Sequence, residues 1–415
     1  MRLGLGSRTM TYEDRLSRNV NRTLWVGFFQ VFLVILPVAV PFFQSKGLSM
    51  QEVFSLQALF GLVVLLTEVP SGYLADLLGR KNTLVVGAVI AALGHSSLLI
   101  ADGFWTLAVF EILLGLSHSL ISGADLALLY DTELALGQDE ETQREVVGKL
   151  YGARTFSEAL AGLGCTAVLL VAGFNELIYL QVLVGWVPVL LVLRLVEPPG
   201  KRLEGDSHVA NMALILRYLL QHSPVLRLVV LALSIWSLTT FYAVWLLQKL
   251  WEMQSIELAH FGWLWGGLTL LAALAGRWAH KVEELLGPRW LLILVGLAPA
   301  LGYLGMQNLG VVGGVLASTT FFIARGLGLV VLRDALNKRV PSEFRATANS
   351  IASFGFRGAF VVTGPIVGYA FDLWGMSTTL AMLALVTLVI FVTLILPLIS
   401  AVGALPEQMK CAEKA

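Results

Sequence analysis

The chain has 415 residues, of which 57% are hydrophobic and only 13% are charged. Soluble globular domains carry about 25% charged residues, so this composition indicates a membrane protein. Basic and acidic residues both number 28, and a net charge of zero gives no reason to expect a nucleic-acid partner. The two cysteines lie in an apolar stretch (Cys165) and near the C terminus (Cys411), which predicts no disulfide framework.

The first predicted element is a polar segment, residues 1–22, that contains five arginines. The apolar stretch after it is too long for the core of a signal peptide and has no small-residue cleavage site. We therefore expect this stretch to be a membrane helix that the mature protein retains.

Apolar stretches of membrane-spanning length continue along the chain. A helix needs about 20 mainly apolar residues to cross a bilayer, and by this measure the sequence predicts an all-α membrane protein with twelve transmembrane helices. They are expected at roughly 23–43, 51–76, 82–101, 104–130, 148–172, 177–196, 224–248, 257–280, 289–307, 309–332, 346–371 and 376–400.

A polar stretch that contains EPPGKRLEGDSH divides the predicted spans into two sets of six. The predicted organisation is a cytoplasmic segment, two six-helix bundles joined by a cytoplasmic linker, and a cytoplasmic tail: 1–22, 23–196, 197–223, 224–400 and 401–415. With the N terminus inside, only Lys46 and Lys249 of the basic residues fall outside. This asymmetry predicts cytoplasmic termini in the plasma membrane, or in the inner membrane of a bacterium.

The two predicted bundles share a repeat. Asp131 and Arg154 are 23 residues apart, and Asp334 and Arg357 repeat that spacing 203 residues later. The same offset relates Met50-Gln51 to Met253-Gln254 and Gly123 to Gly326. Several matches at one offset predict two pseudo-symmetric bundles, an arrangement in which large secondary transporters hold their site near the midplane, between the halves.

The turn between the second and third predicted spans reads GYLADLLGRK, from Gly72 to Lys81. It resembles the signature loop of the major facilitator superfamily, which reads approximately G-x-L-A-D-x-x-G-R-K. The residues in the matching positions are Gly72, Leu74, Ala75, Asp76, Gly79, Arg80 and Lys81. The resemblance implies the fold of that superfamily, and a latch between the halves that closes the cytoplasmic side while the outer side is open.

Each residue of this loop has a physical role to be tested. Gly72 is expected to let a neighbouring helix approach closely, and Gly79 to permit a backbone turn that a side chain would obstruct. Asp76 is expected to accept hydrogen bonds from the N-terminal turn of another helix. Arg80 is a second latch residue, although the positive-inside rule alone would also explain Arg80 and Lys81.

The duplicated charges form predicted gates. Asp131 with Arg154, and Asp334 with Arg357, are expected to pair within each half at the cytoplasmic ends of neighbouring helices. The loop beside the first pair suggests a network that includes Asp76. The alternative is interfacial anchoring, in which the side chains merely extend to the membrane surface.

The fourth predicted span carries three ionisable residues, Glu111, His118 and Asp125, spaced seven apart, with Ser122 near the same stripe. Such groups inside a span are costly and mark functional sites by default. In the resembled superfamily this helix lines the central cavity, so the stripe is expected to bind substrate and protons. The alternative is a set of polar groups that holds neighbouring helices together.

Other ionisable residues extend this predicted site. Arg325 lies at the repeat position of Ser122, and is expected to face Asp125 as an ion pair that opens when substrate or a proton arrives. Glu68 and Glu158 are expected to be structural or coupling partners.

Aromatic side chains crowd the seventh and eighth predicted spans. Trp236 and Tyr242, with Trp25 and Gln30 of the first span, could line a cavity for an amphiphilic or aromatic substrate. Packing or lipid contact explains the aromatic residues equally well.

Together these features predict a secondary active transporter that works by alternating access. The favoured version is an antiporter, a proton-coupled efflux protein for a small organic compound, either cationic or amphiphilic. Glu111 occupies the position where proton-coupled drug exporters of the superfamily usually carry an arginine. Alternatives are symport uptake of a metabolite or siderophore-like compound, and a membrane receptor or sensor that has lost transport.

The expected partners are the substrate, protons and the lipid bilayer. The sequence contains no P-loop, zinc motif or nucleophile elbow, so we expect no cofactor, no metal and no enzymatic activity. The chain is expected to act as a monomer.

Overall fold

A computed structural model describes residues 11–199, 208–221, 223–341 and 344–402. Every regular element within these ranges is a helix. The first group of elements consists of α1 (Tyr12–Gln30), η1 (Leu36–Val38), α2 (Ala39–Ser45), α3 (Met50–Leu78), α4 (Arg80–Ser97), η2 (Leu98–Ile100), α5 (Phe104–Ala135), α6 (Glu140–Leu169) and α7 (Phe174–Val192).

The second group follows the stretch after α7. It consists of α8 (His208–Gln221), α9 (Pro224–Leu231), the π-helical turn η3 (Ala232–Trp236), α10 (Ser237–Met253), α11 (Leu258–Arg277), α12 (Ala279–Asn308), α13 (Gly310–Arg339), α14 (Arg345–Ile390) and a second π-helical turn, η5 (Phe391–Ile395). The chain bends inside α12 and α14 at glycines with positive φ, 75° at Gly287 and 76° at Gly375. Glycine adopts this conformation readily because it has no Cβ.

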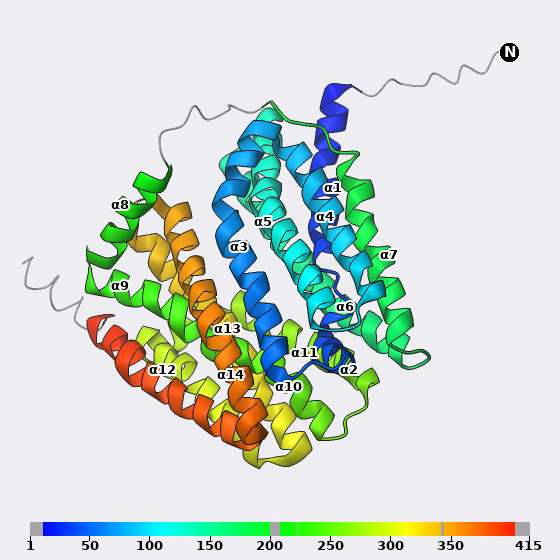
Figure 1. Cartoon of the computed structure of the whole chain (residues 1–415). Helices are drawn as coiled ribbons and strands as arrows, with labels where there is room; N and C mark the ends of the chain where they lie inside the picture. The colour runs from blue at the N-terminus through cyan, green and yellow to red at the C-terminus, as the bar shows by residue number, and fades with distance from the viewer. Residues whose placement is uncertain (1–10, 200–207, 222, 342–343, 403–415) are drawn as a thin grey trace, which may run out of the picture.

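The described part of the chain contains nine helices that are long and apolar enough to cross a membrane. The last of them, Thr347–Val402, turns back at Gly375 and so has two arms (Figure 1). The all-α membrane architecture is therefore confirmed, while the count of twelve spans stays a prediction.

Three predicted boundaries are wrong. The predicted span 23–43 is broken after Gln30, and α1 begins eleven residues earlier than expected, at Tyr12. Helix α6 begins at Glu140 instead of near residue 148, and α5 continues to Ala135. The predicted linker contains a helix, α8. Helices α1, α5 and α6 continue through polar residues beyond their apolar stretches, which a hydropathy criterion does not detect.

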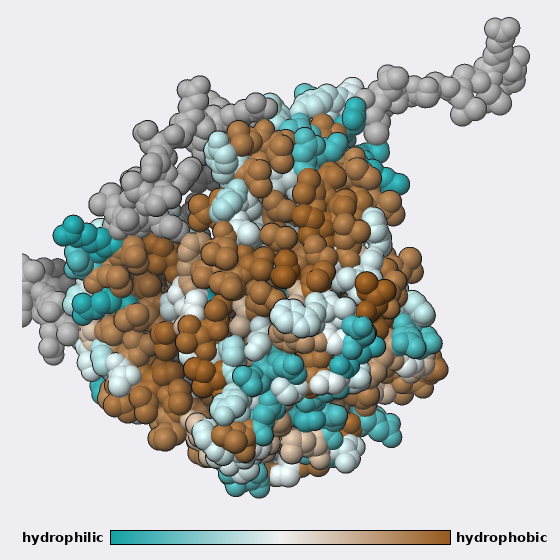
Figure 2. All heavy atoms as spheres, viewed as in Figure 1, coloured by the Kyte–Doolittle hydropathy of each residue, from teal (hydrophilic) through white to brown (hydrophobic). Residues whose placement is uncertain are grey.

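The outer surface carries many large apolar side chains. Leu66, Ile100 and Trp105, for example, are 64%, 73% and 80% exposed. Figure 2 shows apolar residues spread over most of the visible face, with polar ones gathered toward the top and the lower part. An apolar surface of this extent is unfavourable in water, and a multi-pass membrane protein covers it with lipid.

The helices lie as two groups, α1–α7 and α8–α14, whose axes diverge toward one end of the molecule (Figure 1). Two ends can be named from α3. The Met50 end is where α3 begins, and the Arg80 end is where α3 ends and α4 begins. Helices α3 and α14 pack along each other between the groups, as do α6 and α11.

Candidate functional site

At the Met50 end a carboxylate joins the two groups. Asp372, on α14, accepts hydrogen bonds from the backbone N–H groups of Met50 (3.0 Å) and Gln51 (2.8 Å) at the start of α3. The first N–H groups of a helix lack partners within the helix, and the helix dipole favours a negative charge there. The contact therefore holds α14 of the second group against α3 of the first.

Gln248, fully buried on α10, makes a second connection at the Met50 end. Its amide oxygen accepts from the N–H of Val40 (2.9 Å), and its nitrogen donates to the carbonyl of Leu36 (3.2 Å). Close backbone packing adds to this seal, because a Cβ on Gly162 of α6 would lie 2.5 Å from the carbonyl oxygen of Gly262 on α11.

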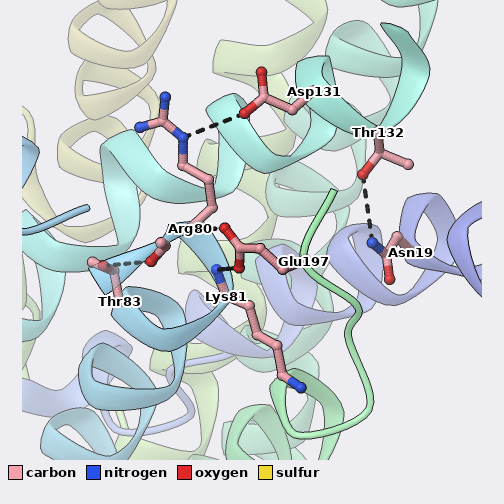
Figure 3. A network of polar contacts seen from close by, with 8 residues as sticks. Asn19, Arg80, Lys81, Thr83, Asp131, Thr132 and Glu197 are labelled. Carbon is pink, nitrogen blue, oxygen red and sulfur yellow. Dashed lines mark hydrogen bonds and ion pairs between the residues drawn. The ribbon is translucent and has the colours of Figure 1, made fainter. Parts of the chain in front are cut away.

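At the Arg80 end a carboxylate binds a helix start in the same way, but within one group. The two oxygens of Glu197 accept from the N–H groups of Arg80 (2.6 Å) and Lys81 (2.7 Å), as Figure 3 shows. Gly79 precedes them with φ +88°, so the predicted backbone turn is confirmed. Glu197 therefore caps the start of α4.

The same end is fastened further by side chains of α1, α4 and α5. Arg80 Nε lies 3.4 Å from Asp131 Oδ2, and the side chain of Asn19 donates to the hydroxyl of Thr132 (Figure 3). The side-chain amide of Asn19 also bonds the backbone of Val196. All of these residues belong to the first group. These contacts connect α1, α4, α5 and the segment directly after α7.

The latch between the groups stays a prediction, because the described contacts do not test it. Gly72 is exposed, and a Cβ built on it would meet nothing within 4 Å, so the expected close approach of a helix at Gly72 is absent. The side chain of Asp76 lies outside the described part of the structure.

Deeper in the first group, Asp125 is fully buried and forms an ion pair with Arg154 of α6. Arg154 also donates to the side-chain oxygen of Gln30 (3.3 Å). The predicted pair of Asp131 with Arg154 is thus wrong. Because α5 and α6 extend into the predicted loop, Asp131 lies about 6 Å from its helix end and Arg154 about 21 Å, at 1.5 Å per residue.

The predicted pair in the second group is wrong for the same reason. Asp334 binds Lys338 of its own helix (2.6 Å). Arg357 lies deeper, where its guanidinium is 3.3 Å from Nε2 of His118 on α5, and Glu68 of α3 is close enough to interact electrostatically. Arg357 therefore faces the other group.

Arg325 does not face Asp125 as predicted. Its guanidinium carbon lies 5.7 Å from the ring centre of Phe241, and the nearby acid is Glu158 of α6. Asp125 has a closer cation in Arg154, on the neighbouring helix of its own group. Glu158 and Glu68 thus each lie near an arginine of the opposite group, and their role as structural or coupling partners stays a prediction.

Glu111 is 4% exposed and accepts a hydrogen bond from Gln57 of α3 (2.7 Å). Among the described residues no cation lies within salt-bridge distance of it. Glu111, His118 and Asp125 therefore have partners on three different helices, α3, α14 and α6. Ser122, near the same stripe, is half-buried.

A central cavity of about 260 Å³ lies between the groups, and Glu111 contributes to its wall. Nearly all of the lining is apolar. The lining residues are Leu33, Ile35, Leu36, Ala39, Phe43, Gln57, Phe60, Gly61, Leu98, Phe110, Glu111, Leu114, Phe241, Trp245, Phe356, Arg357 and Phe360.

The four side chains predicted to line the cavity are absent from this lining. Trp25 is 53% exposed on α1, and Gln30 bonds Arg154. Trp236 is fully buried against Gly328 inside the second group. Tyr242 bonds Thr363 (2.6 Å) behind the cavity wall. Successive residues of a helix point about 100° apart around its axis. The depth of a residue in the membrane, which the sequence indicated, therefore did not predict which aromatic rings face the cavity.

A second cavity, of about 190 Å³, lies nearer the Arg80 end and shares Phe241, Phe356 and Arg357 with the first. Its lining is polar and basic. The other lining residues are Leu233, Ser237, Thr240, Arg325, Leu329, Arg333, Asn349, Ala352 and Ser353.

Three residues that the structure brings into prominence had not been singled out: Glu197, Asp372 and Gln248. The sequence does contain a pattern that could have indicated Asp372. This acid ends the apolar stretch VTGPIVGYAFD, and it lies at the same membrane depth as Ser49, which caps the start of α3. For Glu197 and Gln248 no local pattern exists, since their partners are backbone groups far away in sequence.

Comparison with known proteins identifies the family to which this architecture belongs. The sequence profile of the Major Facilitator Superfamily matches residues 23–338, which is more than half of the chain. No curated protein sequence matches the chain significantly.

Solved structures share the fold at low sequence identity. A bacterial homologue of the human lysosomal transporter Spinster, in an inward-facing and unoccupied conformation, has a TM-score of 0.74 at 15% identity, over 93% of this chain and 97% of that one. The nucleoside transporter NupG gives 0.72 at 12%, over 92% and 98%. A D-xylose–proton symporter gives 0.67 at 15%, over 91% and 97%. At such identities the likeness concerns the fold.

Proposed function

The chain belongs to the Major Facilitator Superfamily, and on that premise we propose that it is a secondary active transporter of a small organic compound that works by alternating access. The observation that carries the proposal is the asymmetry between the ends. Asp372 and Gln248 join the groups at the Met50 end, whereas at the Arg80 end Glu197, which lies directly after α7, binds the start of α4 in the first group. Two adjoining cavities lie between these ends.

The distribution of basic residues supports placing the Arg80 end in the cytoplasm. In that orientation the structure is a cytoplasm-facing state, which an exporter would load from inside the cell. We propose proton-coupled export, with the plasma membrane, or the inner membrane of a bacterium, as the location, and the direction of flux tests it.

Glu111 is our choice for the residue that carries the proton. It lines the cavity, it is buried, and it has no cation partner among the described residues. Asp125 is a weaker choice because Arg154 already neutralises it. A carboxyl group without a counter-ion in such a place is costly in the charged form, so opening and closing of the cavity would change its protonation.

The test is flux through the purified protein in proteoliposomes, with an imposed pH gradient and a panel of small organic compounds. We expect Glu111→Gln to abolish gradient-driven accumulation and to leave exchange of substrate intact. The matched control is Glu133→Gln, which changes a buried acid of the same helix that does not line the cavity.

Three other results of this flux assay would contradict parts of the proposal. Accumulation by Glu111→Gln at the normal rate would contradict the assignment of the proton to Glu111. Inward accumulation would identify an uptake system, and binding without any flux would identify a receptor.

A further inference from the structure

The second cavity has an unbalanced charge. Three arginines line it, Arg325, Arg333 and Arg357, together with hydroxyl and amide side chains, and its lining contains no carboxylate. Among the described residues, no carboxylate lies within salt-bridge distance of these guanidiniums. Glu158 and Glu68 act on Arg325 and Arg357 from across the interface, without direct contact and without lining the cavity.

A half-buried cation with no contacting counter-ion is unfavourable at membrane depth. Arg325 and Arg357 are both only partly exposed. A negatively charged group entering from the Arg80 end would gain charge-assisted hydrogen bonds with them. The helices that carry these arginines, α13 and α14, belong to the group whose axes diverge from the other group toward the Arg80 end (Figure 1).

The central cavity has the opposite character. Six phenylalanines and Trp245 line it, with aliphatic side chains between them. An apolar cavity of 150 Å³ binds benzene, so about 260 Å³ suits a body of one or two aromatic rings, or an alkyl chain of similar volume.

Two buried donors beside this cavity have no hydrogen-bond partner in the described structure, Nε1 of Trp245 and Nε of Arg357. Both atoms carry hydrogen, so a complementary ligand would present an acceptor. Arg357 belongs to both linings, so it stands where the basic cavity meets the apolar one.

We propose that the transported compound is an amphiphilic organic anion. Its single carboxylate, sulfonate or phosphate group is held by Arg325 and Arg357, and its apolar body fills the cavity of phenylalanines. Glu111 lies about 10 Å farther along α5 than His118, the partner of Arg357, at 1.5 Å per residue, which sets the length of the body. This inference rests on the proposed transport function; of the two substrate types expected from the sequence, cationic or amphiphilic, it keeps the amphiphilic one and assigns it a negative charge.

The experiment compares three probes that share one ring system: 2-naphthylacetate, 2-naphthylethylamine and 2-naphthylethanol. Binding to the purified full-length protein in nanodiscs is measured by calorimetry. We expect the carboxylate to bind roughly tenfold or more tightly than the amine and the alcohol, which is the usual scale for hydrogen bonds to a charged group. Octyl phosphate, measured in the same way, shows whether the central cavity binds an alkyl chain or a flat ring system more tightly.

Variants assign the effect to residues. Arg325→Gln and Arg357→Gln should each weaken binding of the carboxylate roughly tenfold and leave the alcohol unchanged, and the retained alcohol binding reports a folded cavity. Arg339→Gln, at the end of α13 and outside both linings, is the matched control and should change neither.

Preference for the amine, or equal binding of all three probes, would overturn the anion inference and leave the transport proposal standing. Equal losses for the carboxylate and the alcohol in the arginine variants would also overturn it. If no probe binds to protein of normal melting temperature, the inference fails, and flux of unrelated compounds in proteoliposomes decides separately whether the chain transports.

Discussion

At the Met50 end Asp372 binds the N–H groups of Met50 and Gln51, and the acid and the helix start belong to different groups of helices. At the Arg80 end Glu197 binds the N–H groups of Arg80 and Lys81, and here the acid lies directly after α7, the last helix of the first group, to which the helix start also belongs. The chemistry is the same in both places, a carboxylate on two consecutive unpaired N–H groups of a helix. Such a contact can act as a gate when it joins helices of different groups, and it stabilises one group when it joins helices of the same group.

The same difference separates contacts that can break during transport from contacts that persist through the cycle. A contact between groups has to form and dissolve in each cycle, whereas a contact within a group moves with it as a rigid body. The three predictions below test the two ends against each other.

The largest effect is expected from filling glycines. Gly162→Leu places a side chain where a Cβ already lies 2.5 Å from the carbonyl of Gly262, so we expect it to cost about 3 kcal/mol in the folded state described here. Gly72→Leu meets nothing within 4 Å and should change the melting temperature little. If the Arg80 end closes during transport by bringing a helix onto Gly72, this second variant keeps its fold and loses flux.

The melting temperature in detergent and the rate of flux together check this pair. A normal melting temperature for Gly162→Leu would mean that α6 and α11 are not in backbone contact. Normal flux by Gly72→Leu would mean that no helix approaches Gly72 during the cycle.

An intermediate effect is expected at the two carboxylates. Asp372→Asn removes the charge and one acceptor from the contact between groups, so the equilibrium should shift roughly tenfold or more toward opening of the Met50 end. Glu197→Gln makes the same change within one group and should leave that equilibrium unchanged.

Distances between spin labels at Ser45→Cys and Glu252→Cys, in a background lacking Cys165 and Cys411, report the opening, because the two positions lie on different groups and are exposed. The same distance distribution in Asp372→Asn as in the parent protein would show that Asp372 is not a gate. An equal shift in Glu197→Gln would show that the two ends are not distinct.

The smallest effect is expected at Asp131. The side chains of Arg80 and Asp131 are 25% and 27% exposed, and exposed ion pairs contribute about 1 kcal/mol or less. Asp131→Asn should therefore destabilise the protein by less than about 1 kcal/mol, and its effect should add to that of Arg154→Gln, since the two residues are not in contact.

Asp125→Asn is the comparison for that cycle. Asp125 and Arg154 form a buried ion pair, so their combined effect should depart from additivity by about 1 kcal/mol or more in unfolding measurements. Coupling between Asp131 and Arg154 of the same size would contradict the pairing seen in the structure.

The outcome for the ionisable residues shows where sequence reasoning reaches its limit. The spacing of seven between Glu111, His118 and Asp125 was sufficient to predict an inward-facing polar stripe, because helical geometry is local. It could not predict the partners. The pairing of Asp125 with Arg154 depends on how deep each lies along its helix, and the ends of α5 and α6 fall in polar stretches that hydropathy misreads.

By itself, the sequence determined the apolar helical architecture, the turn at Gly79 and the placement of ionisable groups at membrane depth. These follow from hydropathy, from the freedom of glycine at positive φ and from the helical repeat, all of which act over a few residues. Tertiary structure alone decided that Asp372 and Gln248 join the groups at one end. It also decided that Trp236 and Tyr242 pack away from the central cavity, and that Arg325 and Arg357 line the same basic cavity. These contacts join residues separated by up to 322 positions, and their geometry depends on how whole helices rotate and slide against each other.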